Sequence, residues 1–263
     1  MTIRNAGPSP GRFFLLVFGV SLPFYAIGAL APRLSRWMPL GLPINALMIL
    51  CPAGVALWLT HREAGRPGVR RLLGRILNSR NGPDKRWLLL SVGIMPAAML
   101  LSYGVQRLLG QSFPHPAWSL STVVFSFALY FFGAIGEELG WMGYAIDPLQ
   151  RQYGVLTASV GLGALWWVWH VVPYHVTGRP AAWILGHGLA TVMFRIIMVW
   201  IYNHTGSSVL TSVLFHAAIN TSIDAFPLRG SRYDPLVTGL ILLGATLLVA
   251  RRQVAGTLTS LST

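Results

Sequence analysis

The chain contains 263 residues, of which 54% are hydrophobic and only 10% are charged, and its mean hydropathy is +0.57. Soluble domains carry about 25% charged residues, so this composition excludes an ordinary soluble domain and predicts a polytopic membrane protein. The formal net charge is +13, but the basic residues lie mostly between apolar segments, as they do in membrane proteins. We therefore expect a lipid bilayer around the protein and no nucleic acid as a partner.

Apolar segments of about the length that crosses a bilayer follow one another along the chain. They cover residues 13–31, 40–59, 87–109, 120–144, 155–173, 181–202, 207–226 and 235–250. The first segment lacks a small-residue cleavage signal and is expected to be a retained helix. In lipid only helices and closed barrels satisfy every backbone group, and these segments are too long for barrel strands. The sequence predicts an all-α fold, a polytopic membrane bundle of about eight transmembrane helices in a single domain over residues 1–263.

The most basic part of the sequence is the loop at residues 61–86, which holds eight basic and two acidic residues. By the positive-inside rule this loop is cytoplasmic. That placement predicts a multi-pass protein of the cell membrane with both termini in the cytoplasm. Apolar residues from Val69 to Leu77 recur at helical spacing opposite the arginines. The pattern predicts a helix that either lies on the membrane surface or connects two spans with one solvated face.

Two adjacent glutamates, Glu137 and Glu138, lie inside the fourth apolar segment. The sequence has only seven acidic residues, and a charged side chain at bilayer depth costs at least ~2.5–3.5 kcal/mol. Two adjacent carboxylates cost more, because like charges repel each other. Packing does not require such a pair, so we interpret it as functional.

Histidines and an asparagine lie in the later apolar segments. His170 follows Trp166 by four residues in the fifth segment, and His216 precedes Asn220 by four in the seventh. Residues four apart share one helix face. If the helices alternate in direction, Glu137, His170 and His216 all lie about 15–20 Å from the inner boundary. A carboxylate, two imidazoles and a carboxamide at one depth predict a water-activating site in a cavity open toward the cytoplasm.

Each of these residue types also has a simpler structural interpretation. A histidine in a transmembrane helix more often forms an interhelical hydrogen bond than takes part in catalysis, and we expect this of His175 and His187. Tryptophans mostly pack or anchor the protein at the interface, so Trp166 is a weaker candidate for substrate contact. Arg195 lies inside its span, at least seven residues from either end, which favours a carboxylate partner over an escape to the interface.

The polar residues fall into three motifs that together resemble a known family, the CAAX-prenyl-endopeptidase and bacteriocin-processing (CPBP, or Abi) intramembrane proteases. The motifs are GEELGWMGY at residues 136–144, WWVWH at residues 166–170 and HAAIN at residues 216–220. Each motif alone is weak, but their order, spacing and placement on three apolar segments make the resemblance specific. It is clear over about residues 131–221, the motif core, and only topological elsewhere.

The resemblance implies a role for each motif residue. Glu137 would be the general base that activates water, and His170 would bind and polarise that water. His216 and Asn220 would complete the site, with Asn220 as a donor to the tetrahedral oxyanion. This chemistry is coherent, because a carboxylate in a low-dielectric cavity can accept a proton and amide or imidazole donors can stabilise an oxyanion. The supporting residues would be Glu138, Arg195, Trp166 and Trp141.

One position departs from the family pattern. The family has an arginine four residues after the second glutamate, a spacing suited to an ion pair on one helix. Here that position is Met142, so Glu138 needs another cation or must be protonated. Arg195 is the basic residue nearest the middle of any span, and we expect it to pair with Glu138.

The sequence thus favours an intramembrane endopeptidase that acts on a peptide or membrane-protein substrate within the membrane or at its inner face. A non-catalytic binding or immunity protein of the same family is the first alternative, and a proton-coupled transporter the second. Transport predicts internal repeats and broken helices, which the sequence does not display. No cofactor is expected. Zinc is the alternative, with Glu137, His170 and His216 as ligands, although the His-Glu-x-x-His pattern is absent.

Overall fold

The computed structural model describes residues 9–34, 44–77, 83–114 and 119–260. The regular elements in these ranges are all helical. In chain order they are α1 (Pro10–Leu34), the 3-10 helix η1 (Ile44–Leu50), α2 (Cys51–Leu77), α3 (Lys85–Leu108), α4 (Leu120–Gly140), the π-helix η2 (Trp141–Ala145), α5 (Ile146–Tyr153), α6 (Val155–Val176), α7 (Ala181–His204), α8 (Val209–Asp224) and α9 (Pro235–Ser260). The predicted all-α class is confirmed for the described part of the chain.

Five of the described helices are long and apolar enough to cross a membrane: α1, α3, α4 with its continuation to Tyr153, α6 and α7. The chain is therefore a multi-pass membrane protein. The predicted spans at residues 13–31, 120–144, 155–173, 181–202 and 235–250 lie entirely in helix, and those at 87–109 and 207–226 do so except for Leu109 and for residues 207–208 and 225–226. Residues 44–59 of the second span are helical, and its residues 40–43 lie outside the described residues. Five described helices, rather than the expected eight, meet this limit. One of the other three segments, α8, has 16 residues, which gives ~24 Å against a hydrocarbon core of about 30 Å.

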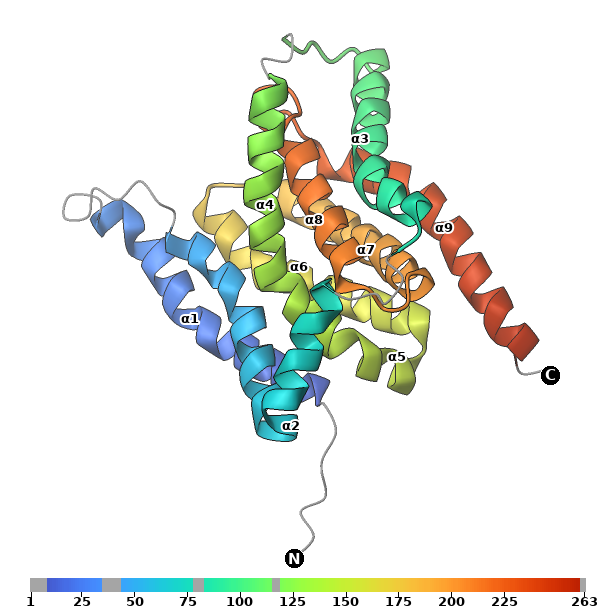
Figure 1. Cartoon of the computed structure of the whole chain (residues 1–263). Helices are drawn as coiled ribbons and strands as arrows, with labels where there is room; N and C mark the ends of the chain where they lie inside the picture. The colour runs from blue at the N-terminus through green and yellow to red at the C-terminus, as the bar shows by residue number, and fades with distance from the viewer. Residues whose placement is uncertain (1–8, 35–43, 78–82, 115–118, 261–263) are drawn as a thin grey trace, which may run out of the picture.

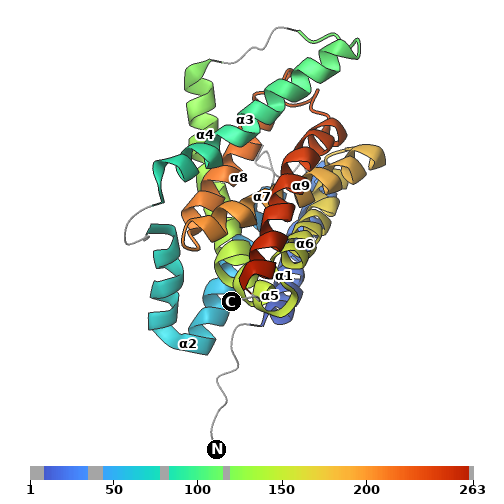
Figure 2. The same ribbon diagram turned by 90° about the vertical axis from the view of Figure 1, so that its right-hand side faces the viewer.

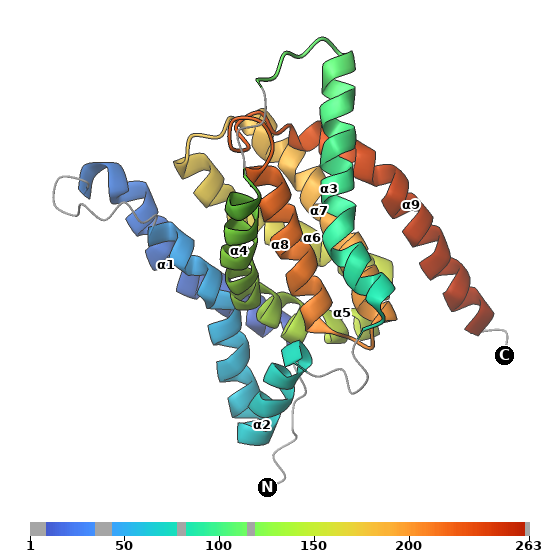
Figure 3. The ribbon, with the colours of Figure 1, turned by 45° about the horizontal axis from the view of Figure 1, so that its top comes forward.

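The helix α7 lies at the centre of the bundle. Its apolar window is 72% buried, whereas the windows of the other four spanning helices are 22–33% buried. It packs against α6, α8 and α9, and Figure 2 shows it between α8 on one side and α6 and α9 on the other. The helices α1 and α9 lie at opposite edges of the bundle (Figures 1 and 3). The buried position of α7 explains how it can carry Arg195 without exposing the charge to lipid.

Glycines bring the helices of the motif core close together. A Cβ atom on Gly163 of α6 would lie 2.9 Å from Cα of Val192 and 3.1 Å from Cβ of Arg195, both in α7. A Cβ atom on Gly140 of α4 would lie 2.6 Å from the backbone oxygen of Pro52 in α2. Small residues permit such backbone approach in membranes, where helix association depends on close packing.

The α4 helix changes its hydrogen-bonding pattern directly after the two glutamates. The backbone N–H of Ile146 donates to the carbonyl of Trp141, five residues earlier, which closes the π-helix η2. Single π-turns of this kind are frequent at functional sites. The eight-residue helix α5 follows directly, and Gly154 is its C-cap.

Of the basic loop predicted at residues 61–86, residues 61–77 form the C-terminal part of α2 and residues 85–86 begin α3. Residues 78–82 lie outside the described residues. The α2 helix breaks at Gly65, whose φ of 61° and ψ of −162° are not helical, and it continues to Leu77. The expected helix at residues 69–77 is confirmed. Its residue Leu72 is buried, and Arg75 donates a hydrogen bond of 2.6 Å to the carbonyl of Gly143 in η2. This segment is therefore docked on the end of α4; its location on a membrane surface stays a prediction.

Candidate active site

Glu138 of α4 forms a buried ion pair with Arg195 of α7. The Nη1 and Nη2 atoms of Arg195 donate hydrogen bonds of 2.6 and 3.3 Å to Oε2 and Oε1 of Glu138, and both side chains are 0% exposed. The guanidinium also lies 4.4 Å from the ring centroid of Trp166, a cation–π distance. The pairing expected between Arg195 and Glu138 is confirmed.

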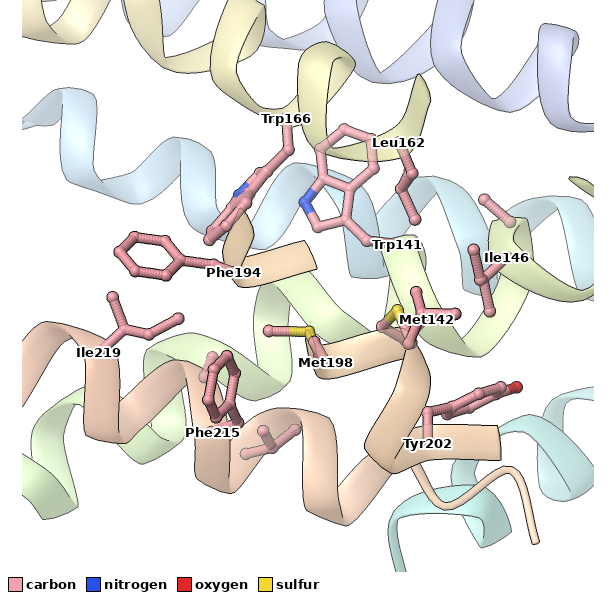
Figure 4. Close-up of a cluster of buried hydrophobic side chains, with 14 of the residues drawn as sticks. Trp141, Met142, Ile146, Leu162, Trp166, Phe194, Met198, Tyr202, Phe215 and Ile219 are labelled. Carbon is pink, nitrogen blue, oxygen red and sulfur yellow. The ribbon is translucent and has the colours of Figure 1, made fainter. Parts of the chain in front are cut away.

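Met142 occupies an apolar position beside this ion pair. It is fully buried in the hydrophobic cluster, and Figure 4 shows it next to Met198. The Sδ atom of Met198 accepts a hydrogen bond of 3.0 Å from Nη1 of Arg195. The guanidinium that the family pattern places at residue 142 is thus supplied from α7.

His216 of α8 contacts the same carboxylate. Its Nδ1 atom lies 2.8 Å from Oε1 of Glu138. An ionised carboxylate only accepts hydrogen bonds, so Nδ1 carries the proton and Nε2 is the atom that remains available. Glu138 therefore links Arg195 to His216 and fixes the orientation of the imidazole. The sequence predicted that His216 belongs to the site but not that its partner is the second glutamate.

Glu137 is buried and has a separate partner. Nε1 of Trp166 in α6 donates a hydrogen bond of 2.8 Å to Oε2 of Glu137. Trp166 also packs edge-on against His216, with ring centroids 5.0 Å apart. The indole of Trp166 therefore contacts Glu137 and also His216, the partner of Glu138. Trp166 is thus more central to the site than the sequence predicted.

His170 is oriented by its own helix. Its Nδ1 atom lies 2.9 Å from the backbone carbonyl of Trp166, one turn earlier. A carbonyl oxygen only accepts, so Nδ1 is protonated and Nε2 is free to bind another group. The imidazole stacks on Tyr174 with a centroid distance of 5.6 Å.

The four residues predicted to be catalytic line one cavity of about 610 Å³. Glu137 comes from α4, His170 from α6, and His216 and Asn220 from α8. Residues distant in the chain are thus brought together as the matched depths predicted. A volume of this size suits a small ligand or a short stretch of peptide.

The cavity extends away from the basic segment of α2. Its lining includes residues 177–180, which connect α6 to α7. Arg75 of the basic segment instead pairs with Asp147 of α5 at 2.7 Å. The helix α5 directly precedes the N-terminus of α6 and lies in the lower part of Figure 1. The two ends of the 22-residue α6 lie about 33 Å apart. If the basic segment is cytoplasmic, the cavity mouth at residues 177–180 would face the opposite side, because the cavity follows the other half of α6. The side of the membrane to which the cavity opens stays a prediction.

Aromatic and basic residues form the outer part of the cavity, and sequence reasoning did not assign them to the site. The hydroxyl of Tyr174 lies 2.8 Å from Nε2 of His187, the interhelical contact expected of that histidine. Arg179 lies over the ring of Trp183 at 4.6 Å. Nδ1 of His187 and the hydroxyl of Tyr233 are buried without a partner among the described residues, and burial raises the pKa of Tyr233, which keeps it a donor.

A sequence signal existed for part of this group. Trp166, His170 and Tyr174 repeat at intervals of four residues and so lie on one face of α6. The pattern could have extended the second motif by one turn. Tyr233 lies between α8 and α9, and no periodicity marks it.

Trp141, expected as a supporting residue, is absent from the described lining of the cavity. Its ring packs against Phe13 and Trp169 with centroids 5.6 Å from each. It therefore supports the α1–α4–α6 packing rather than the cavity itself.

A metal site does not form in the described residues, where no three His, Cys, Asp or Glu side chains are arranged to hold an ion. We therefore derive no chemical step through a zinc ion held by Glu137, His170 and His216.

The protein is thus a multi-pass membrane protein with a buried pair of glutamates. Histidines from neighbouring helices lie beside these glutamates and line a polar cavity. Comparison with known proteins shows what this chain is similar to. The family model for Rce1-like type II CAAX prenyl endopeptidases matches residues 117–222. The CAAX prenyl protease 2 of Methanococcus maripaludis is 25% identical over 228 residues, which cover 81% of this chain and 83% of the relative. Over residues 117–222 the chain is thus similar to the Rce1-like type II CAAX prenyl endopeptidase (CPBP) family.

Proposed function

We propose that the protein is an intramembrane endopeptidase that hydrolyses peptide bonds with a water molecule activated by Glu137. The observation that carries the proposal is the convergence of Glu137, His170, His216 and Asn220 on one cavity of about 610 Å³. The similarity to this family supports the same reaction, since the relative in Methanococcus maripaludis is named a protease.

The buried hydrogen bonds suit this chemistry. Trp166 holds Oε2 of Glu137, which leaves Oε1 to accept a proton from water. Nε2 of His170 accepts a second hydrogen bond from the same water and so orients it. The hydroxide oxygen bonds to the carbonyl carbon, and the proton on Glu137 then passes to the leaving amine as the carbon–nitrogen bond breaks.

Asn220 and His216 act on the other side of the reacting carbonyl. The carboxamide N–H of Asn220 stabilises the tetrahedral oxyanion. His216 lines the cavity beside it, oriented by the hydrogen bond of 2.8 Å to Glu138. Glu138 and Arg195 are positioning residues, because they act on the reaction through His216 and do not line the described cavity.

The substrate is a peptide or a membrane protein. We place both termini and the basic segment of α2 on the cytoplasmic side of the cell membrane, on the strength of the positive-inside rule. The cavity then faces outward, so the scissile bond enters through the end formed by residues 177–180. No cofactor takes part in the proposed reaction.

The test is cleavage of a peptide library by the purified protein in detergent or nanodiscs, with and without chelator. Glu137→Gln keeps the shape of the side chain and removes its basicity, so the rate should fall at least ~10²-fold. The matched control is Glu63→Gln, the same change at a glutamate that accepts a hydrogen bond from Tyr144 at 2.7 Å and does not line the cavity. Chelator should leave the rate unchanged.

Full cleavage by a well-folded Glu137→Gln protein would refute the role of Glu137. If the wild-type protein binds library peptides but cleaves none, the protein is the non-catalytic binding member of the family instead. Loss of activity in both glutamate variants would indicate a general effect on folding. The melting temperatures of the two proteins show whether each variant is folded.

A further inference from the structure

The C-terminal part of α2 contains a second concave site, remote from the proposed active site. A cavity of about 620 Å³ lies on this segment. The described residues that line it, which we call the arginine pocket, are Arg66, Pro67, Arg70, Arg71, Gly74 and Arg75. Four of the six side chains are guanidinium groups, and none is acidic.

Arg75 forms the fixed wall of this pocket. Its Nη1 atom donates to the carbonyl of Gly143 at 2.6 Å, its Nη2 atom pairs with Asp147 at 2.7 Å, and Nη2 also contacts the hydroxyl of Tyr202. Its side chain is 25% exposed. A guanidinium held on several partners loses little further entropy when a ligand contacts it.

The other three arginines have no carboxylate partner. All seven acidic residues of the chain lie in the described ranges, and none forms an ion pair with Arg66, Arg70 or Arg71. The nearest acidic residue along the chain, Glu63, accepts a hydrogen bond from Tyr144. Arg66 and Arg70 are four residues apart, and like charges at this helical spacing destabilise the helix. A bound anion would remove that repulsion.

The surroundings place the pocket at a membrane interface. Trp58, earlier in α2, is 46% exposed and lies 5.8 and 5.6 Å from the guanidiniums of Arg12 and Arg62. An exposed tryptophan flanked by arginines is typical of the headgroup level of a bilayer. Leu73, next to the pocket on the same segment, is 41% exposed and is available to the apolar side of that interface.

We infer that the arginine pocket binds a phosphate group, and that the phosphate is the headgroup of an anionic phospholipid. The planar guanidinium fork matches phosphate oxygens in pairs, and basic amphipathic segments at the cytoplasmic interface attract anionic lipids. A soluble phosphate compound offers the same chemistry to the pocket, and the experiment separates the two sources.

The experiment measures binding to the full-length protein in detergent, with short-chain phosphatidylglycerol, short-chain phosphatidylcholine and inorganic pyrophosphate as probes. The site variant carries Arg66→Gln, Arg70→Gln and Arg71→Gln. The control carries Lys85→Gln, Arg86→Gln and Arg151→Gln, which remove the same charge outside the pocket. Phosphatidylglycerol should bind about 10-fold more weakly to the site variant, and about equally to the control and the wild type.

A third variant keeps the charge and changes only its shape. With Arg66→Lys, Arg70→Lys and Arg71→Lys, a fork-shaped phosphate site should still lose several-fold in affinity, because an ammonium group cannot bind two oxygens in one plane. Melting temperatures of the three variants show whether each is folded, and the exposed positions of all three arginines favour folding.

Each outcome decides the inference. Phosphatidylglycerol should bind more tightly than pyrophosphate to the wild type, and this binding should weaken in the glutamine and lysine site variants but not in the control. That result supports the lipid headgroup. Equal or tighter binding of pyrophosphate with the same loss supports the pocket and replaces the lipid by a soluble phosphate. Equal losses in the glutamine site and control variants, or full affinity in the lysine variant, overturn the pocket in favour of general surface charge. Failure of the wild type to bind any phosphate-bearing probe overturns it entirely.

Discussion

At the scale of single residues, the central feature of the site is one carboxylate with two partners from different helices. Arg195 and His216 both contact Glu138, and Trp166 contacts Glu137. The two adjacent glutamates therefore have separate tasks. Glu138 is locked in a structural network, whereas Glu137 keeps one oxygen for chemistry.

The ion pair between Glu138 and Arg195 can be tested by removing the arginine at residue 195 and placing one at residue 142. Arg195→Met should destabilise the protein by ~3–5 kcal/mol, because a buried carboxylate is stranded. Adding Met142→Arg to that variant should restore most of the loss, since residue 142 lies four positions after Glu138 and next to Met198, which contacts the guanidinium. Melting temperatures in detergent give the comparison.

The reciprocal variants complete this cycle. Met142→Arg alone should destabilise, because two guanidiniums would then share one buried carboxylate, and Met142→Leu should be nearly neutral, because it conserves apolar volume. A wild-type melting temperature for Arg195→Met would contradict the dependence and would mean that Glu138 is protonated.

The hydrogen bond from Trp166 to Glu137 makes a second prediction at this scale. Trp166→Phe keeps an aromatic ring and removes the donor, so kcat should fall about 10-fold, the effect of losing a hydrogen bond worth ~1.4 kcal/mol to a charged group. The neighbouring Trp167→Phe loses a hydrogen bond of 2.8 Å to the carbonyl of Ile184 and should leave kcat unchanged. Equal effects of the two variants would show that the Glu137 contact has no special role.

The candidate site was predictable as a set of residues but not as a set of contacts. Glu137, His170, His216 and Asn220 were identified because polar groups are costly in apolar segments and therefore conspicuous. Their partners were harder to predict. Arg195 was found by elimination, as the basic residue at mid-span, whereas the bonds from His216 to Glu138 and from Trp166 to Glu137 depend on how α6 and α8 rotate against α4.

At the scale of helices, the close contact between α6 and α7 holds Arg195 at its depth. Gly163→Ala would place a methyl group 2.9 Å from the backbone of Val192 and 3.1 Å from Cβ of Arg195, so we expect a loss of ~1–3 kcal/mol in stability. Gly161→Ala, on the same helix with no heavy atom within 4 Å, should be neutral or slightly stabilising.

Thermal unfolding of the two glycine variants in detergent measures this difference. A destabilised Gly163→Ala protein should also lose activity. The added methyl group pushes α7 away from α6, and Arg195 then moves away from Glu138. If both alanine variants melt at the same temperature, the helices have room to separate, and the close approach at Gly163 is not required for the site.

The helices themselves followed from local sequence, with two exceptions. Long apolar runs predicted the positions of the main helices because every backbone group must be bonded within lipid. The π-helix η2 has no such signal, since it depends on one changed hydrogen bond between Trp141 and Ile146. The break at Gly65 is marked by a glycine and a nearby proline, but its direction is set by the docking of Leu72 and Arg75 on η2.

At the scale of the whole molecule, the proposed orientation places the basic segment and the cavity mouth on opposite sides of the membrane. Single cysteines on a Cys51→Ala background test this in intact cells. An impermeant thiol reagent added outside should label Thr177→Cys, at the mouth of the cavity, and should not label Arg71→Cys in the basic segment.

Permeabilised cells serve as the control, because both cysteines are exposed and should then react. The reverse pattern in intact cells would place the cavity mouth in the cytoplasm and would show that the arginine distribution does not follow the positive-inside rule here.

The sequence by itself determined the helical class, the membrane environment and the residues of the candidate site. These follow from local properties: apolar length, the distribution of arginines and the rarity of carboxylates at depth. Tertiary structure alone decided that α7 is the central helix, that His216 bonds to Glu138 and Trp166 to Glu137, and that the cavity runs toward residues 177–180. These depend on contacts between residues far apart in the chain, whose geometry is fixed only when the helices pack.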